Sequence, residues 1–325
     1  MLDVFYLLLG IGVLTAGGEF LIRGALGVSN RIGMSPLLSG LIIVGFGTSM
    51  PELVVSVEAA LSGQPDIAIG NVVGSNIANI LLILGICAAI TPLVISPLSL
   101  RRDALVVMAS SFLFILLALD GSLGLIDAMI LLILLILYLV WAYWTESKNS
   151  TTSESSLSGE VHKAEALEIT VVPKSLIWTL AEVIGGLVLL IVGSQVLLKG
   201  AVGIAEGLGV SEALIGLTLV AVGTSLPELT ISVMAALRKH ADVAVGNILG
   251  SNIFNLLGIL GVSAILQPIE VKGRVVQFDQ WVMLGVSIVL YLFLFTSRKL
   301  SRVEGVLLLS GYLTYLGVSY FYFSN

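Results

Sequence analysis

The sequence contains one segment twice. Residues 40–85 align without a gap to residues 216–261 at a constant offset of 176, and 27 of the 46 aligned positions are identical. The shared positions include polar and helix-breaking residues inside apolar runs, where they are costly in lipid and therefore indicate a function. These pairs are Thr48/Thr224, Ser49/Ser225, Pro51/Pro227, Glu52/Glu228, Ser75/Ser251 and Asn79/Asn255. Such self-similarity indicates that two copies of one structural unit build the protein.

The composition is that of an integral membrane protein. Hydrophobic residues make up 57% of the chain and charged residues 11%, whereas a soluble chain carries roughly 25% charged residues. No alternating polarity typical of a membrane β-barrel is present. The predicted fold is therefore all-α, a polytopic membrane protein of ten transmembrane helices. Stretches long enough to span a bilayer lie near residues 2–22, 34–61, 68–90, 103–119, 125–144, 176–198, 213–237, 244–266, 280–297 and 303–323.

The two copies are predicted to run in opposite directions through the membrane, because five spans, an odd number, separate each residue from its repeat mate. Inverted repeats of this kind hold their substrate near the axis that relates them. We expect residues 1–145 to form the first five-helix repeat and residues 176–325 the second. The linker between them, residues 146–175, is rich in Ser, Thr and Glu without EF-hand spacing, and we interpret it as a plain tether.

Lysine and arginine predict the orientation, because they concentrate on the cytoplasmic side of membrane proteins. One set of loops carries Lys199, Lys272 and Arg274, and the other carries the remaining twelve basic residues of the fifteen. The sequence thus predicts a multi-pass protein of the cell membrane with both termini outside and the central linker in the cytoplasm. The expected partners include the lipid bilayer, and nothing indicates nucleic acid or an obligatory protein partner.

A proline and a carboxylate occur together inside the second span. Pro51 lacks an N–H and clashes with the carbonyl four residues earlier, so we expect a kink that frees the carbonyl of Gly47. Irregular backbone at this depth is tolerated only beside protein or a watery cavity. Thr48 and Ser49 lie four and three residues before Glu52, so their hydroxyls share a helix face with its carboxylate. The second repeat has the same arrangement.

These groups form an all-oxygen donor set with two negative charges, which suits hard cations such as Ca²⁺ and Na⁺. Two carboxylates neutralise one Ca²⁺ or two Na⁺, so the two ions would occupy the site alternately. No thiolate or imidazole accompanies them, and we expect no cofactor beyond the transported ions. The small residues around Ser75 and Ser251 have an alternative role in close helix packing.

The paired motifs GTSMPE…GNVVGSN and GTSLPE…GNILGSN resemble the α-repeats of the cation/Ca²⁺ exchanger superfamily, especially prokaryotic Na⁺/Ca²⁺ exchangers. The resemblance covers essentially all ten spans. It implies antiport by alternating access at a mid-membrane cation site between spans 2, 3, 7 and 8, with the first and sixth spans as a sliding pair. The implied ligands are the side chains of Thr48, Ser49, Glu52, Ser75, Asn79, Thr224, Ser225, Glu228, Ser251 and Asn255, with backbone carbonyls near Gly45 and Ala221.

Several alternatives remain at this stage. K⁺-dependent relatives carry an aspartate where Asn255 stands, so the neutral amide argues against K⁺ co-transport. Proton-coupled relatives usually carry other acidic motifs, but protons compete with cations for any buried carboxylate, and an H⁺-coupled antiporter is the main alternative. A cation channel would need no counter-ion. An enzyme is not expected, because His162 and His240 both lie in predicted cytoplasmic segments, away from the intramembrane serines and glutamates.

Overall fold

The structure is a computed structural model, and it describes residues 2–32, 34–94, 97–152, 175–207, 223–297 and 299–323. The elements of the first half are α1 (Leu2–Ile32), α2 (Pro36–Ser39), η1 (Gly40–Gly45), α3 (Phe46–Thr48), α4 (Met50–Leu61), α5 (Pro65–Ala78), η2 (Asn79–Leu84), α6 (Gly85–Ile90), β1 (Leu93–Val94), α7 (Pro97–Leu117), η3 (Ala118–Asp120), β2 (Ser122–Leu123) and α8 (Leu125–Thr152). Those of the second half are α10 (Leu176–Gly207), α13 (Leu226–Leu237), α14 (Ala241–Ile253), η6 (Phe254–Ile259), α15 (Leu260–Leu266), β3 (Ile269–Glu270), η7 (Val275–Asp279), α16 (Gln280–Ser297), β4 (Lys299–Leu300) and α17 (Arg302–Phe323). The all-α prediction is confirmed.

Seven of the described helices are long and apolar enough to cross a membrane, and the bent pair Leu37–Thr48 and Met50–Leu61 makes an eighth. The count of ten spans stays a prediction. α17, over the expected span 303–323, is not among these helices, and part of the expected span 213–237 lies outside the described residues. α8 continues to Thr152, past the expected span end at residue 144 and into the expected linker. Residues 153–174 of that linker also lie outside the described residues.

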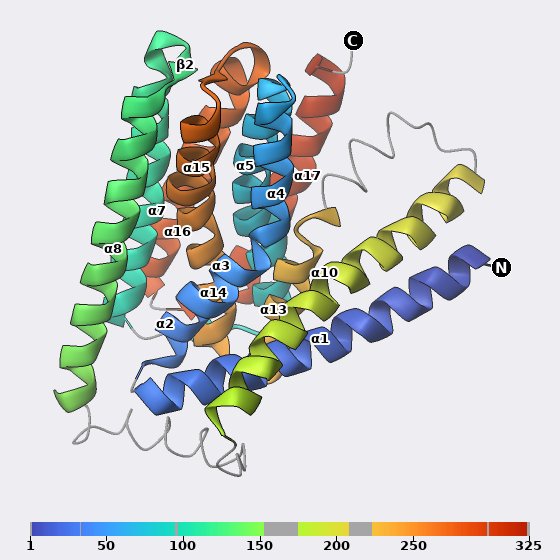
Figure 1. Ribbon diagram of the computed structural model, residues 1–325, viewed down its shortest axis with the longest axis vertical. Coiled ribbons are helices and arrows are strands. Elements are labelled where there is room, and N and C mark those ends of the chain that lie inside the picture. The colour runs from blue at the N-terminus through green and yellow to red at the C-terminus, as the bar shows by residue number, and fades with distance from the viewer. Residues whose placement is uncertain are drawn as a thin grey trace.

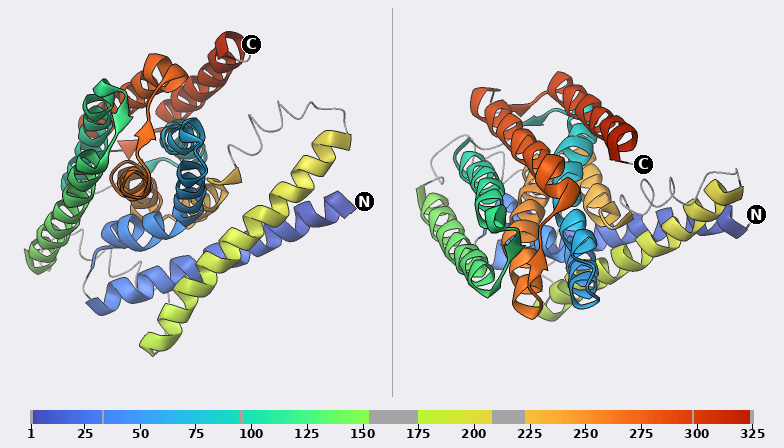
Figure 2. Two further views of the ribbon diagram at one scale, coloured as in Figure 1. Left: turned by 45° about the horizontal axis from the view of Figure 1, so that its top comes forward. Right: turned by 90° about the horizontal axis from the view of Figure 1, so that it is seen from above.

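α1 and α10 lie side by side, obliquely across the remaining helices (Figures 1 and 2). Glycines allow their backbones to approach closely. A Cβ atom on Gly10 would lie 2.5 Å from the backbone nitrogen of Leu197, and one on its repeat mate Gly186 would lie 2.5 Å from that of Leu21. No side chain fits at these positions without moving backbone, so the two helices form one closely packed pair.

The contacts of this pair are reciprocal. Partner numbers fall along α10 as residue numbers rise along α1, so the two helices run antiparallel. In a two-fold arrangement, when a residue contacts a partner, the repeat mate of that residue contacts the repeat mate of the partner. The inverted repeat predicts this pattern. The matched contacts are Gly10–Leu197 with Gly186–Leu21, Gly17–Leu190 with Gly193–Leu14, and Gly24–Val183 with Gly200–Leu7.

Two short strand pairs join the repeats in the same reciprocal way. β1 of the first half pairs antiparallel with β4 of the second, with Leu93 opposite Leu300. β3, which aligns with β1 in the repeat, pairs antiparallel with β2, with Ile269 opposite Leu123. Each strand pair therefore joins a connection between helices of one repeat to a connection between helices of the other.

The expected kink near Pro51 is present and is sharp. The helical segment Leu37–Thr48 and α4 meet at 43°, and the break falls at Ser49, whose φ of −84° and ψ of 8° are not helical. Pro51 then occupies the first turn of α4, where its missing N–H leaves no helical hydrogen bond unmade. In the second repeat, α13 begins directly after Ser225, whose φ and ψ are −87° and 8°. Both breaks place a glutamate in the first turn of a helix, where the helix dipole favours negative charge.

Candidate cation site

Two buried glutamates form the centre of the candidate site. Glu52 in α4 and Glu228 in α13 are each only 1% exposed. Each accepts a hydrogen bond from a serine of the other repeat. The Ser49 hydroxyl donates to Glu228 Oε1 at 2.9 Å, and the Ser225 hydroxyl donates to Glu52 Oε1 at 3.2 Å. Each helix break thus carries one serine and one glutamate, and the serine of each break donates a hydrogen bond to the glutamate of the other break.

Other predicted residues join this cluster. Ser225 also lies 3.5 Å from the hydroxyl of Ser75 on α5. Ser251 on α14 lies 3.5 Å from Glu228 Oε1 and donates to the backbone carbonyl of Gly45 at 3.0 Å. The expected contribution of the Gly45 carbonyl is therefore consistent with the structure, while Ala221 lies outside the described residues.

The two asparagines are buried at π-helical turns but do not bond the glutamates. Asn79 begins η2, and its amide donates to Asn252 Oδ1 at 3.0 Å. Asn255 lies in η6 and has no hydrogen-bond partner for either polar atom. Single π-helical turns occur frequently at functional sites because they re-aim side chains.

Several buried oxygens of the site are left without a hydrogen bond. Buried polar atoms are almost always paired, so an unpaired group of acceptors marks a place for a ligand that supplies positive charge. No group of three His, Cys, Asp or Glu side chains occurs among the described residues, so the charge comes from the two glutamates. Within the described part of the chain, the unpaired oxygens of predicted site residues are Glu52 Oε2, Glu228 Oε2, Thr224 Oγ1, Asn79 Oδ1 and Asn255 Oδ1.

Sequence reasoning missed a second pair of asparagines. The amide of Asn71 donates to the backbone carbonyl of Glu52 at 3.1 Å and to the Ser56 hydroxyl at 2.9 Å. Its mate Asn247 makes the same contacts, to the Glu228 carbonyl at 3.2 Å and to Ser232 at 2.9 Å. These residues hold the backbone beneath each glutamate. The sequence does contain a signal for this pair, because an asparagine occupies the same position of the GN motif in both repeats.

A cavity of about 620 Å³, which we call the vestibule, lies on one face of the described structure and reaches Ser75 and Thr224. Lys272 and Arg274 lie at its outer part, and Ser75 and Thr224 line it beside the glutamates. Arg274 is held there by Asp279, at 2.9 Å, and donates to the Ser319 hydroxyl at 2.7 Å. A hydrated cation could therefore enter from this face.

The opposite face is closed by backbone packing. A Cβ on Gly250 of α14 would lie 2.1 Å from the carbonyl oxygen of Leu41, and one on Gly246 would lie 2.5 Å from that of Leu37. Among the described residues, nothing lies within 4 Å of a Cβ on their repeat mates on α5, Gly74 and Gly70, which line the vestibule. Within the described part of the chain, the same pair of glycines is thus covered in one repeat and open in the other.

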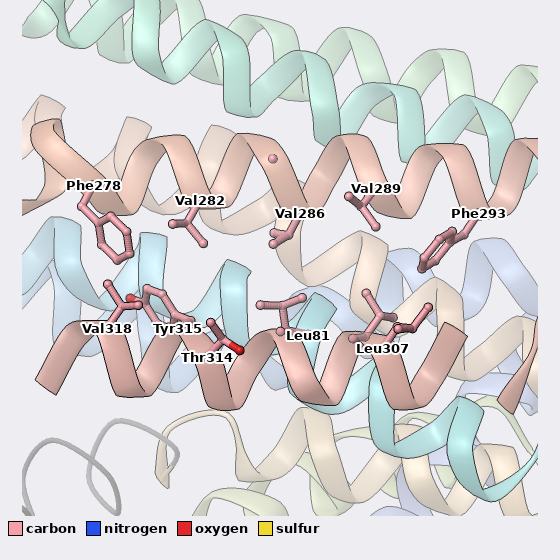
Figure 3. Close-up of a pocket in the computed structure, with 13 residues that line it drawn as sticks. Leu81, Phe278, Val282, Val286, Val289, Phe293, Leu307, Thr314, Tyr315 and Val318 are labelled. Atoms are coloured by element: carbon pink, nitrogen blue, oxygen red, sulfur yellow. The ribbon is translucent and has the colours of Figure 1, made fainter. Parts of the chain in front are cut away.

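A separate groove of about 500 Å³ lies between α16 and α17 (Figure 3). Side chains such as Val286 and Leu307 face each other across it. None of its 13 lining residues is charged, so it offers no site for a cation.

Comparison with known proteins finds matches that cover both repeats of the sequence. Residues 2–144 and 178–321 match the sequence pattern of the family described as sodium/calcium exchanger protein. The chain is 33% identical over 349 residues to the sodium/calcium exchanger MaX1 of Methanosarcina acetivorans, with 97% of each chain covered. It is also 33% identical over 323 residues to the inner membrane protein YrbG of Escherichia coli, covering 98% of this chain and 97% of that one.

Solved structures give the same relationship. The sodium-calcium exchanger NCX_Mj, in crystals soaked with Na⁺ and Ca²⁺, superposes with a TM-score of 0.80 at 32% sequence identity, covering 98% of each chain. The same exchanger soaked with zero Na⁺ and Ca²⁺ superposes with a TM-score of 0.81, covering 97% of this chain and 98% of that one. The overall fold is therefore shared.

Proposed function

Because the chain belongs to the sodium/calcium exchanger family, we propose that it exchanges Ca²⁺ for Na⁺ across the membrane by alternating access at the Glu52/Glu228 site. The family consists of multi-pass membrane transporters rather than enzymes. The observation that carries the proposal is the pair of buried glutamates, each bonded to a serine of the other repeat and each with one unpaired carboxylate oxygen.

The donor chemistry supports Ca²⁺ and Na⁺ as the ions. Ca²⁺ takes six to eight oxygen ligands, and carboxylates, hydroxyls, amide oxygens and backbone carbonyls all serve. The ten predicted side chains, with the carbonyls of Gly45 and Ala221, supply these four types of oxygen. The two negative charges match one Ca²⁺ or two Na⁺, which gives competition between the ions without any further acidic group.

The one-sided vestibule supports alternating access. A channel needs a continuous path, whereas here one face is open toward Ser75 and the other is sealed between η1 and α14. With the orientation predicted from lysine and arginine, the open face is the outside of the cell. The structure then corresponds to an outward-open state, ready to take ions from outside.

Ion fluxes test this function directly. We expect purified protein in liposomes loaded with Na⁺ to take up ⁴⁵Ca²⁺ when Na⁺ is diluted outside, with choline or K⁺ equally effective as the balancing cation. Uptake that ignores Na⁺ and follows a pH gradient would establish the proton-coupled alternative. Uptake that requires K⁺ would contradict the expectation, based on the uncharged side chains of Asn79 and Asn255, that K⁺ is not co-transported. ⁴⁵Ca²⁺ entry with no counter-ion would indicate a channel.

Labelling of single cysteines tests the inverted topology. Ser62 and Arg238 are repeat mates at the ends of α4 and α13, and both are exposed. We expect a cysteine at Ser62 to react with a membrane-impermeant maleimide only from outside, together with one at Lys272. A cysteine at Arg238 should react only from the cytoplasm. Reaction of both mates from the same side would contradict an inverted repeat.

A further inference from the structure

The Asn71 and Asn247 side chains each have a second polar atom, and the structure uses it on one face only. On the closed face, the Thr48 hydroxyl donates to Asn247 Oδ1 at 3.1 Å, so a residue of the first repeat bonds one of the second. By the repeat, Thr224 should bond Asn71 in the same way. Instead, Thr224 Oγ1 has no hydrogen-bond partner, and both residues line the open vestibule.

The difference follows the packing of the two faces. Asn247 is fully buried, where α14 packs against η1, and the neighbouring Gly250 touches Leu41. Asn71 is only partly buried, and no described residue lies within 4 Å of a Cβ on Gly74 of the same helix. The amide donors of both asparagines are engaged identically, since each holds the carbonyl of its own glutamate. The two asparagines therefore differ in whether the oxygen accepts a hydrogen bond from the threonine of the other repeat.

We propose that Asn71 and Asn247 are positioning residues that work in turn, each accepting a hydrogen bond from the other repeat's threonine only while its own face is closed. When the open face closes, Thr224 donates to Asn71 Oδ1; when the closed face opens, Thr48 releases Asn247. The proposal rests on the proposed exchange function, and it names the contacts that tie access to the site.

The bond also prepares the threonine as an ion ligand. A hydroxyl has one proton to donate and two lone pairs to offer. When the proton is directed to an asparagine oxygen, the lone pairs are free for a cation beside the glutamate. Closure of a face and completion of the ligand set on that face therefore occur through the same hydrogen bond.

Accessibility of mirror-related cysteines tests the proposal. Val55 lines the vestibule and its mate Ile231 is fully buried on the closed face. We place a single cysteine at either position after replacing the buried Cys87 by alanine. A membrane-impermeant maleimide is then applied from the vestibule side for Val55→Cys and from the opposite side for Ile231→Cys, in buffer free of Na⁺ and Ca²⁺. The ratio of the two labelling rates reports the balance between the two access states.

The mirror variants should shift this ratio in opposite directions. Asn71→Ala removes the bond of the vestibule-closed state, so labelling at Val55→Cys should rise relative to Ile231→Cys by about fivefold, the shift expected of one ordinary hydrogen bond. Asn247→Ala should lower the ratio by a similar factor. Both variants lose the same amide contacts to a glutamate carbonyl, so that common effect cancels in the comparison.

Two further pairs of variants keep the test decisive. If an alanine variant does not fold, Thr224→Val and Thr48→Val remove the same two bonds from the donor side and should shift the ratio in the same two directions. Ser56→Ala and Ser232→Ala disturb only the amide side and should not produce opposite shifts. Mirror variants that shift the ratio in one direction, or leave it unchanged, would overturn the proposal. Labelling needs no transported ion, so it gives its answer even if ⁴⁵Ca²⁺ uptake shows that the ion assignment is wrong.

Discussion

Replacing either Glu52 or Glu228 by glutamine should reduce Na⁺-driven ⁴⁵Ca²⁺ uptake at least about 100-fold, since contacts to a charged group contribute roughly 1.5–3 kcal/mol each and a carboxylate offers more than one. Each glutamate supplies one of only two charges in the described site, and a dehydrated Ca²⁺ needs both. The fold should survive, because the glutamine Oε1 still accepts the hydrogen bond from Ser225 or Ser49. Size-exclusion chromatography and thermal unfolding check that both variants are intact.

Glu58→Gln is the matched control. Glu58 lies on the same helix as Glu52, but it is exposed and has no acidic repeat mate. Its replacement should leave uptake close to that of the wild type. Normal uptake by a correctly inserted Glu52→Gln or Glu228→Gln protein would rule out the site described here.

The glycine pair Gly74 and Gly250 should separate stability from transport. Gly250→Ala places a Cβ 2.1 Å from the Leu41 carbonyl, so it should lower the thermal midpoint, as overpacking by about 1–3 kcal/mol does. Gly74→Ala meets no described residue within 4 Å and should unfold at or above the wild-type temperature. Uptake by Gly74→Ala should nevertheless fall by at least about tenfold. The packing now seen at Gly250 leaves no room for a Cβ atom, and closing this face by the same packing would leave no room for one at Gly74.

Uptake and unfolding are measured on the same preparations. A Gly74→Ala protein that transports at the wild-type rate would show that the vestibule closes by another packing. A Gly250→Ala protein as stable as the wild type would show that η1 can withdraw from α14 at no cost.

The sequence was sufficient for the membrane class, the helical fold and the kink, and it singled out the residues of the candidate site. Polar residues repeated inside apolar runs are rare enough that Glu52 and Glu228 could be singled out without coordinates. The kink followed from Pro51 alone, although the break itself falls at Ser49, two residues earlier, because Pro is favoured inside the first turn of the helix that follows.

Partners across the repeats could not be predicted in this way. The pairing of Ser49 with Glu228 rather than with its own neighbour Glu52 depends on how two helix breaks meet in space. Helical spacing predicts only which side chains share a face. The role of Asn71 was missed for a related reason: its amide bonds the backbone carbonyl of Glu52 on a different helix, and helical spacing does not predict contacts between helices. The asymmetry between the two faces cannot be read from two nearly identical segments at all.

The glycine contacts between α1 and α10 bear on leakage. On each helix, three glycines contact the backbone of the other helix, so no side chain separates the two backbones there. We therefore expect the two helices, one from each repeat, to move together as one rigid rod. A single rod that leaves one face must approach the other. A state open on both sides, which would let Ca²⁺ run down its gradient and dissipate the cell's stored ion gradients, would require this rod to split along its tightest seam.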